Sequence, residues 1–145
     1  MNAGGNITAT APAGQAIGIF AASYFADVDV LASGAISANA YGNAYGIHVY
    51  AYGYYAGYGD VSISNDGSVS ATATSQFGSA TGIYATTTDG ALTIDSAGTI
   101  TVQAGADAYG INAIIDGDGT VAVTTGGSIS VTSDYDNAYG ILADS

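Results

Sequence analysis

Short apolar segments alternate with small polar residues along the whole chain, and glycines stand between the segments. In Gly90 to Ala113, apolar side chains recur at every second position of Leu92-Thr93-Ile94, Ile100-Thr101-Val102 and Ile111-Asn112-Ala113. A period of two is that of a half-buried β-strand. No segment shows a helical period with caps, so we predict an all-β protein.

This three-strand unit, called a rung below, occurs five times. The rungs cover residues 5–26 (partial), 27–59, 60–90, 91–119 and 120–145. The second strand of each rung starts at Ile7, Ile36, Val69, Ile100 or Ile129, so the period is 29, 33, 31 and 29 residues. The first rung is expected to lack its opening strand. Such a repeat predicts a stacked architecture, with its insertions confined to loops.

Two glycines recur in every rung. One stands two positions before the second strand: Gly5, Gly34, Gly67, Gly98 and Gly127. The other precedes the isoleucine of the third strand: Gly18, Gly46, Gly82, Gly110 and Gly140. We expect them to adopt corner conformations that residues with a Cβ resist.

A unit of about 30 residues cannot bury its inner face alone, but stacked units can. The prediction is a single domain, residues 1–145: a parallel β-solenoid (β-helix) of about five three-stranded rungs with uncapped ends. Inward pairs would be Val28/Val30, Ile36/Ala38 and Ile47/Val49 in the second rung, and Leu92/Ile94, Ile100/Val102 and Ile111/Ala113 in the fourth. Five rungs at a spacing of about 4.8 Å make a rod about 24 Å tall.

The amino-acid composition excludes several classes of function. The chain has 12 Asp, no Lys, Arg or Glu, and a formal net charge of −12. It should therefore be repelled by nucleic acid and anionic membranes, and its longest apolar stretch is too short for membrane insertion. Cysteine is absent, which removes disulfides and thiolate metal sites. A chain without Lys or Arg would resist trypsin-like proteases, which suits an extracellular or cell-surface location.

The pattern V-x-V-x-x-x-G-x-I-x-A followed by A-x-G-I-x-A, seen from Gly5 to Ala143, resembles the repeats of bacterial autotransporter passengers and filamentous-haemagglutinin-type β-helix adhesins. The resemblance implies a β-helix and a bacterial origin. It implies little about activity, because such passengers display many functions on one scaffold.

Tyrosine supplies the first candidate site. Tyr50, Tyr52, Tyr54, Tyr55 and Tyr58 crowd one connection, and this favours a contact surface for glycans, cells or lateral association. Tyr45, Tyr109 and Tyr139 precede the Gly-Ile pair and would form a stacking column that stabilises a corner. Outward Ser and Thr on the second strands, such as Thr8 and Thr101, suit a soluble strand face more than ice or glycan binding.

Aspartate and histidine supply weaker candidate sites than tyrosine does. Asp116 and Asp118 form an acidic turn that could bind Ca²⁺, but they lack the full pattern of a calcium loop, and Asp and Gly are ordinary turn residues. No other metal site or cofactor is expected. His48, the only histidine, would lie at an outward strand position without a catalytic partner. We therefore expect no enzyme activity.

Two functional hypotheses remain. Uncapped rungs expose unpaired strand edges, and the missing opening strand leaves a socket, so the chain could polymerise head to tail as the structural subunit of an extracellular filament. Salt or divalent cations would favour this by screening the charge. The alternative is a fragment of a bacterial surface adhesin that binds glycans or cells through the Tyr-rich loop.

Overall fold

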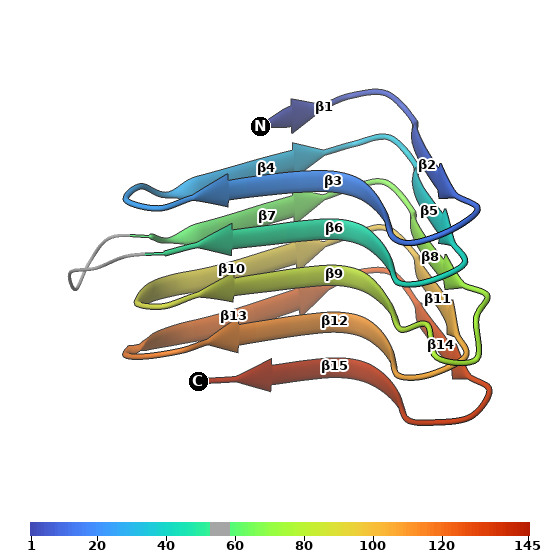
Figure 1. Ribbon diagram of the computed structural model, residues 1–145. Coiled ribbons are helices and arrows are strands. Elements are labelled where there is room, and N and C mark those ends of the chain that lie inside the picture. Colours follow the sequence, from blue (N-terminus) through green and yellow to red (C-terminus); the bar gives the residue numbers. More distant parts are fainter. Residues whose placement is uncertain (53–58) are drawn as a thin grey trace.

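The computed structural model describes residues 1–52 and 59–145, which form a β-solenoid of three parallel five-stranded sheets and, within that range, no helix. Figure 1 shows the rungs stacked from the N-terminus at the top to the C-terminus at the bottom. The predicted fold class is confirmed. No described residue belongs to a helix that could cross a membrane.

Each strand pairs in parallel with its equivalent in the neighbouring rung. Sheet A contains β1 (Asn2–Ala3), β4 (Val28–Ala32), β7 (Val61–Asn65), β10 (Gly90–Ser96) and β13 (Gly119–Thr125). Sheet B contains β2 (Ile7–Ala11), β5 (Ile36–Ala40), β8 (Val69–Ala73), β11 (Ile100–Ala104) and β14 (Ile129–Ser133). Sheet C contains β3 (Ala16–Ser23), β6 (Ala44–Ala51), β9 (Ala80–Thr87), β12 (Ala108–Ile115) and β15 (Ala138–Asp144).

The first rung differs from the sequence prediction, because it does have an opening strand. Strand β1 is only two residues long, and Asn2 and Ala3 pair with Leu31 and Ala32 at the end of β4. The ammonium group of Met1 also donates a hydrogen bond to the carbonyl oxygen of Asp29. Val28 and Asp29, at the start of β4, have no register partner in β1.

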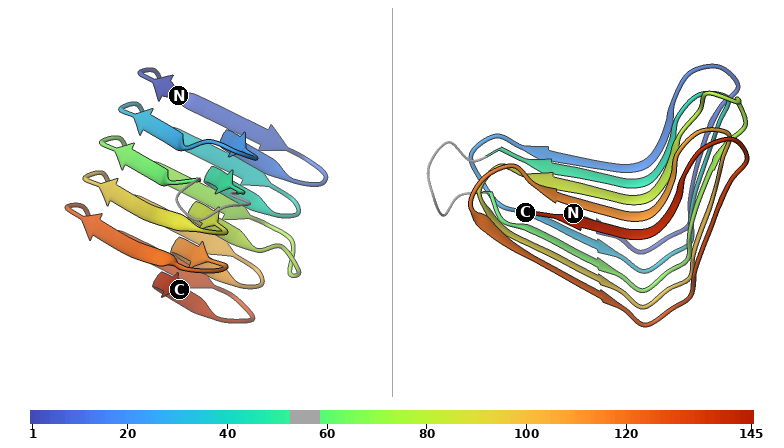
Figure 2. Two further views of the ribbon diagram at one scale, coloured as in Figure 1. Left: turned by 90° about the vertical axis from the view of Figure 1, so that its left-hand side faces the viewer. Right: turned by 90° about the horizontal axis from the view of Figure 1, so that it is seen from below.

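The third strand is longer than predicted. In the fourth rung it begins at Ala108, three residues before Ile111. Gly110 and Ile111 are both buried, which breaks the strict alternation of the strand. The strands of sheet C are bent, and Figure 2 shows this bend repeated in every rung.

The core is a thin aliphatic stack between the three sheets. All the inward pairs predicted for the second and fourth rungs are buried. Alanines of sheet C, such as Ala44 and Ala108, line the core beside them. At one corner, the side-chain amide nitrogen of the buried Asn65 donates to Gly67 O at 2.7 Å and to Ser96 Oγ at 3.1 Å. Parallel pairing and aliphatic burial thus stabilise the rungs together.

The recurring glycines serve a different purpose from the one expected. Among the described residues, positive φ occurs only at Gly14, Gly59, Gly90 and Gly117, none of which belongs to the two recurring sets. A Cβ on Gly34, Gly67, Gly98 or Gly127 would instead lie 1.8 to 2.3 Å from a carbonyl oxygen of the preceding rung. Close approach between rungs, rather than backbone conformation, requires glycine there.

Candidate interaction surfaces

The two ends of the solenoid expose strand edges. Within the described chain, β1, β2 and β3 have no further partner at one end, and β13, β14 and β15 have none at the other. Unpaired N–H and C=O groups on such edges are templates for pairing with another strand. The ends are therefore the first candidate interaction surfaces.

The last rung also exposes side chains that are buried elsewhere. Ile141 is 46% exposed, whereas Ile47, Ile83 and Ile111 in the same column are fully buried. The inward residues Val121, Val123, Ile129 and Val131 of this rung are only partly buried. At the C-terminal end, the inward apolar residues of the last rung are therefore not covered by another rung of the described chain.

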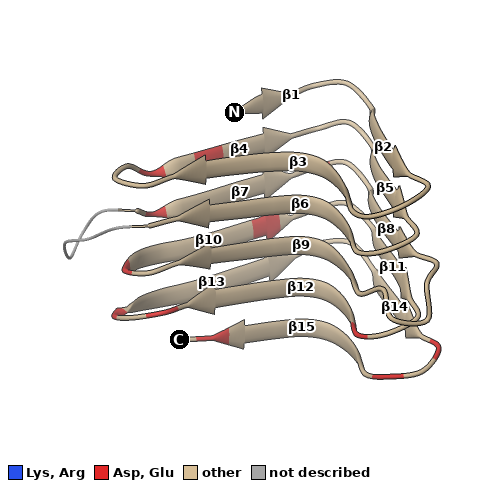
Figure 3. Ribbon diagram, viewed as in Figure 1, with Lys and Arg blue, Asp and Glu red and all other residues tan. Residues whose placement is uncertain are grey.

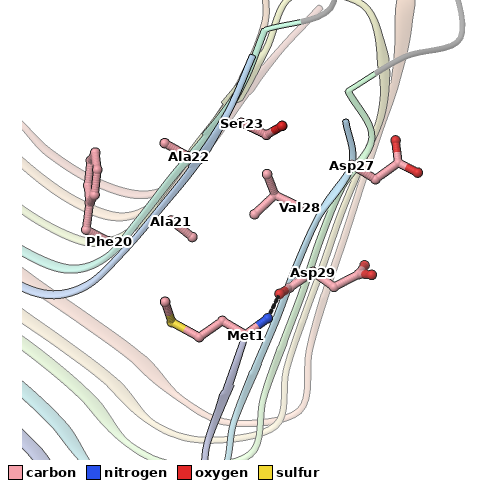
Figure 4. Close-up of a pocket in the computed structure, with 8 residues that line it drawn as sticks. All are labelled: Met1, Phe20, Ala21, Ala22, Ser23, Asp27, Val28 and Asp29. Atoms are coloured by element: carbon pink, nitrogen blue, oxygen red, sulfur yellow. Dashed lines mark hydrogen bonds between the residues drawn. The ribbon is translucent and has the colours of Figure 1, made fainter. Parts of the chain in front are cut away.

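A cavity of 490 Å³ marks the N-terminal end (Figure 4). It lies between β3 and β4, where Val28 points toward Ala21 across the space. The cavity exists because β1 is short and leaves the first half of β4 uncovered. The opening strand that was expected to be missing is therefore present in shortened form, and the cavity lies next to it.

Both recurring glycine sets end in open space. A Cβ on Gly5 would meet nothing within 4 Å, and the same holds for Gly140. In the interior members of Gly140's column, a Cβ would lie 2.4 to 2.6 Å from a carbonyl oxygen of the following rung. Gly5 faces out of the N-terminal end and Gly140 out of the C-terminal end, so nothing in the described chain requires glycine at either position.

Aspartate and asparagine side chains join the rungs in one direction. Asp27 Oδ1 accepts a hydrogen bond from Asp60 N at 3.1 Å, and Asp89 Oδ1 accepts one from Asp118 N at 3.2 Å. Asn43 Oδ1 does the same with Ser79 N at 3.0 Å. Each acceptor precedes its donor by one rung. The carboxylates before the first strands therefore have a structural role as inter-rung caps.

The two predicted calcium candidates lie in one connection between strands. Asp116 and Asp118 are exposed in the connection between β12 and β13. Across residues 1–52 and 59–145, no three His, Cys, Asp or Glu side chains gather closely enough to hold a metal ion. Figure 3 shows the acidic residues mostly at the connections, with Asp29 and Asp95 on sheet A.

Sheet C carries an aromatic cluster on its outer face. Phe20, Tyr45, His48, Tyr50 and Tyr84 are its central members. The His48 ring centroid lies 5.5 Å from that of Phe20 and 4.8 Å from those of Tyr45 and Tyr84. Tyr24 and Tyr52 extend the cluster, with their rings stacked at 5.8 Å.

His48 is therefore half-buried among rings instead of lying alone on the surface. Its Nδ1 atom is buried without a hydrogen-bond partner among the described residues, and burial lowers the pKa of its imidazole. Burial likewise raises the pKa of the Tyr84 phenol. Both groups are neutral at pH 7, so the cluster adds no charge to this face.

The predicted tyrosines fall into three groups. Tyr50 and Tyr52 belong to the cluster, while Tyr54, Tyr55 and Tyr58 lie outside the described residues. The strand register places Tyr45, Tyr109 and Tyr139 in one column, but Thr81 separates Tyr45 from the other two. Only Tyr109 and Tyr139 stack on each other in this column, with centroids 5.0 Å apart and an interplanar angle of 8°.

Sequence reasoning missed Phe20, His48 and Tyr84 as one group. They occupy the position immediately after the Gly-Ile pair in the first three rungs. An alignment of the repeats carries this signal, although the position changes to Asn112 and Leu142 in the last two rungs.

No protein-family model matches the chain, and comparisons with curated proteins and solved structures found no match either. The β-solenoid of about five rungs is consistent with β-helix repeats in general.

Proposed function

We propose that the protein is the structural subunit of an extracellular filament and polymerises head to tail by continuing the β-solenoid from chain to chain. The last rung of one copy would stack on the first rung of the next. Such a contact joins two different surfaces and gives an open polymer when the rotation between copies does not close a ring.

The strand register between interior rungs indicates how the last rung of one copy would align with the first rung of the next. Ile7 is aligned with Ile36, and Ile100 with Ile129, in one column of sheet B. Continuing that column pairs β14 of one copy with β2 of the next. The same rule pairs β15 with β3, whereas β13 meets only the two residues of β1. Sheets B and C would therefore contribute most of the junction.

The observation that carries the proposal is the pair of glycines Gly5 and Gly140. Neither has a neighbour that excludes a Cβ in the isolated chain, yet every interior glycine of their columns does. A stacked copy would bring Gly127 O onto Gly5, and Gly18 O onto Gly140. Both glycines then acquire the steric requirement that their interior equivalents have.

The apolar cross-section favours the same contact. Covering the exposed half of Ile141 would contribute about 1 kcal/mol, because complete burial of such a side chain contributes about 1.5 to 3 kcal/mol. The partly buried Ile129 and Val131 would add to this. Their new neighbours would be Ile7 and Ala9 of the next copy.

The net charge of the chain determines the salt concentration at which copies would associate. A net charge of −12 on every copy opposes association, and added salt reduces this repulsion. An extracellular location is supported by the lack of Lys and Arg, which removes trypsin-type cleavage sites. The resemblance of the repeat to bacterial surface passengers supports the same location.

The test compares alanine substitutions at neighbouring glycines. Gly5→Ala should fold normally but abolish fibres in electron micrographs taken in 0.5 M NaCl. Gly4→Ala is the matched control, because Gly4 aligns with Ser33, a position that tolerates a side chain, and a Cβ there is 3.9 Å from its nearest neighbour.

A second pair of variants, one test and one control, addresses the C-terminal end. Gly140→Ala should block growth, whereas Gly126→Ala should not, because Gly126 lies over Ala97 at ordinary contact distance. Fibres formed equally well by all four variants would refute continuous stacking. So would wild-type protein that stays monomeric at high concentration, in salt and in Ca²⁺.

A further inference from the structure

The outer face of sheet C is nearly free of charge. Its five strands contain one aspartate, Asp144, although the chain has 12. Figure 3 shows the acidic residues of the described chain at the connections and on sheet A, with only Asp144 at the end of β15. In a chain without Lys or Arg, this distribution leaves one broad aromatic face uncharged.

The same face exposes apolar rings. Phe20 is 47% exposed and Tyr139 38%, and Leu142 is 37% exposed in the column of Phe20. Sheet B is also uncharged, but its outward residues are polar and mostly small, such as Ser70 and Thr101. Only sheet C, among the three described sheets, combines absence of charge along most of its length with side chains that gain from leaving water.

We propose that the outer face of sheet C is a lateral self-association surface, on which the sheet C face of a second copy packs. Two copies meeting through sheet A would bring Asp29 and Asp95 of each copy together without any counter-charge. Sheet C avoids this cost. Lateral pairing of single copies does not require the head-to-tail contact described above.

The two-fold arrangement common in homodimers suits this face. A two-fold axis through the middle rung would place Phe20 of one copy opposite Leu142 of the other. Both belong to the column that also holds His48, Tyr84 and Asn112. The apolar side chains at each end of the face would then be buried against those at the opposite end of the other copy.

The available area indicates a weak contact between single copies. Five strands of eight residues at most span about 24 Å by 26 Å, or about 620 Å² per copy, at the usual strand spacings. Standard interfaces bury about 800 Å² per partner. Association would be weak for one pair and would strengthen in proportion to length between polymers.

A second copy fits this face better than a sugar. Sugar sites combine rings with accessible polar groups that fix orientation. Here His48 Nδ1 and Asn112 Oδ1 are buried without partners, so they are not presented to a ligand. The remaining groups on this face are chiefly ring faces, phenol hydroxyls and the half-buried Thr86.

The experiment places the same new charge on two different faces. Thr86→Asp adds a carboxylate to sheet C, and Thr101→Asp adds one to sheet B, both at outward positions. Both changes are made in the full chain carrying Gly5→Ala, which removes head-to-tail growth, so the outcome does not depend on that contact. Sedimentation velocity in 0.5 M NaCl measures the dimer dissociation constant.

We expect Thr86→Asp to raise this constant at least tenfold and Thr101→Asp to leave it unchanged. Phe20→Ser should weaken the dimer too, whereas Phe77→Ser, on a connection where the ring is 80% exposed, should not. Equal effects on both faces, or no dimer at any concentration, would overturn the proposal. Binding of a neutral glycan that depends on Phe20, without dimerisation, would assign the face to sugar instead.

Discussion

At the scale of single residues, glycine sets how closely the rungs stack. A Cβ on the glycine two positions before each interior second strand would clash with a carbonyl oxygen of the preceding rung. A Cβ on the glycine before the isoleucine of each interior third strand would clash with a carbonyl oxygen of the following rung. Gly98 is the tightest case, since a Cβ would lie 1.8 Å from Gly67 O. A methyl group there would force two rungs apart at the corner between β10 and β11.

We therefore expect Gly98→Ala to lower the free energy of unfolding by at least about 2 kcal/mol, in the range of overpacked interiors. Gly126→Ala is the control and should change it by less than about 0.5 kcal/mol, as surface substitutions usually do. Urea unfolding followed by circular dichroism measures both. Similar values for the two variants would show that the rungs can separate at little cost.

His48 gives the aromatic cluster a dependence on pH. Burial lowers its pKa below the unfolded value of 6.5, so the unfolded chain binds a proton more readily than the folded one. Stability is then fully present above pH 6.5 and declines as the pH falls through the folded pKa. Carboxylates ordinarily titrate near pH 4, well below this window.

We predict that the wild-type protein loses stability between pH 7.5 and pH 5.5, and that His48→Asn loses less. Asparagine suits the site because Asn112 occupies the same column in the fourth rung. Urea midpoints at the two pH values provide the measurement. An unchanged pH dependence in the variant would mean that the imidazole is solvated in the folded state.

At the scale of strands, each element depends on its position in the stack. Interior strands pair on both sides and bury their inward residues completely, whereas β15 pairs only with β12. Ile111 and Ile141 are aligned in one column, yet one is fully buried and the other is 46% exposed. These two isoleucines therefore allow a buried position and an edge position of the same column to be compared.

Ile111→Ala should cost about 2 to 5 kcal/mol of stability, as buried large-to-small substitutions do. Ile141→Ala should cost less than about 1.5 kcal/mol in dilute, low-salt solution, where copies stay apart, because about half of that side chain is already in water. Equilibrium unfolding of the two variants tests this. A cost at Ile141 as large as that at Ile111 would imply that the last rung is covered even in monomers.

The strand pattern could be predicted because a period of two and a fixed spacing both survive in the sequence. Val28, Ile36 and Ile47 were recognisable as inward residues for this reason. The aromatic cluster was not recognisable, because Phe20, His48 and Tyr84 are 28 and 36 residues apart and meet only through the register. The reason for the recurring glycines could not be predicted from the sequence, because close approach and positive φ both select glycine.

At the scale of the whole molecule, the solenoid is a stack whose rungs contact only their neighbours, so its stability should be a sum over rungs and junctions. Figure 2 shows the same cross-section repeated along the axis. We propose that the strand edges at both ends and the open glycines Gly5 and Gly140 allow this repetition to continue from one copy to the next. Twelve carboxylates oppose the extension, so assembly should need salt.

The helical rise of the filament tests head-to-tail stacking most directly. Five rungs per copy at about 4.8 Å each predict a rise of about 24 Å per subunit along the fibre axis, with strands perpendicular to that axis. Electron cryomicroscopy with helical reconstruction, supported by fibre diffraction, measures both values. A rise of 24 Å with an unbroken 4.8 Å repeat through the junction would agree with continuous stacking. A filament whose solenoid axes lie across the fibre, or whose rungs are interrupted between subunits, would contradict it.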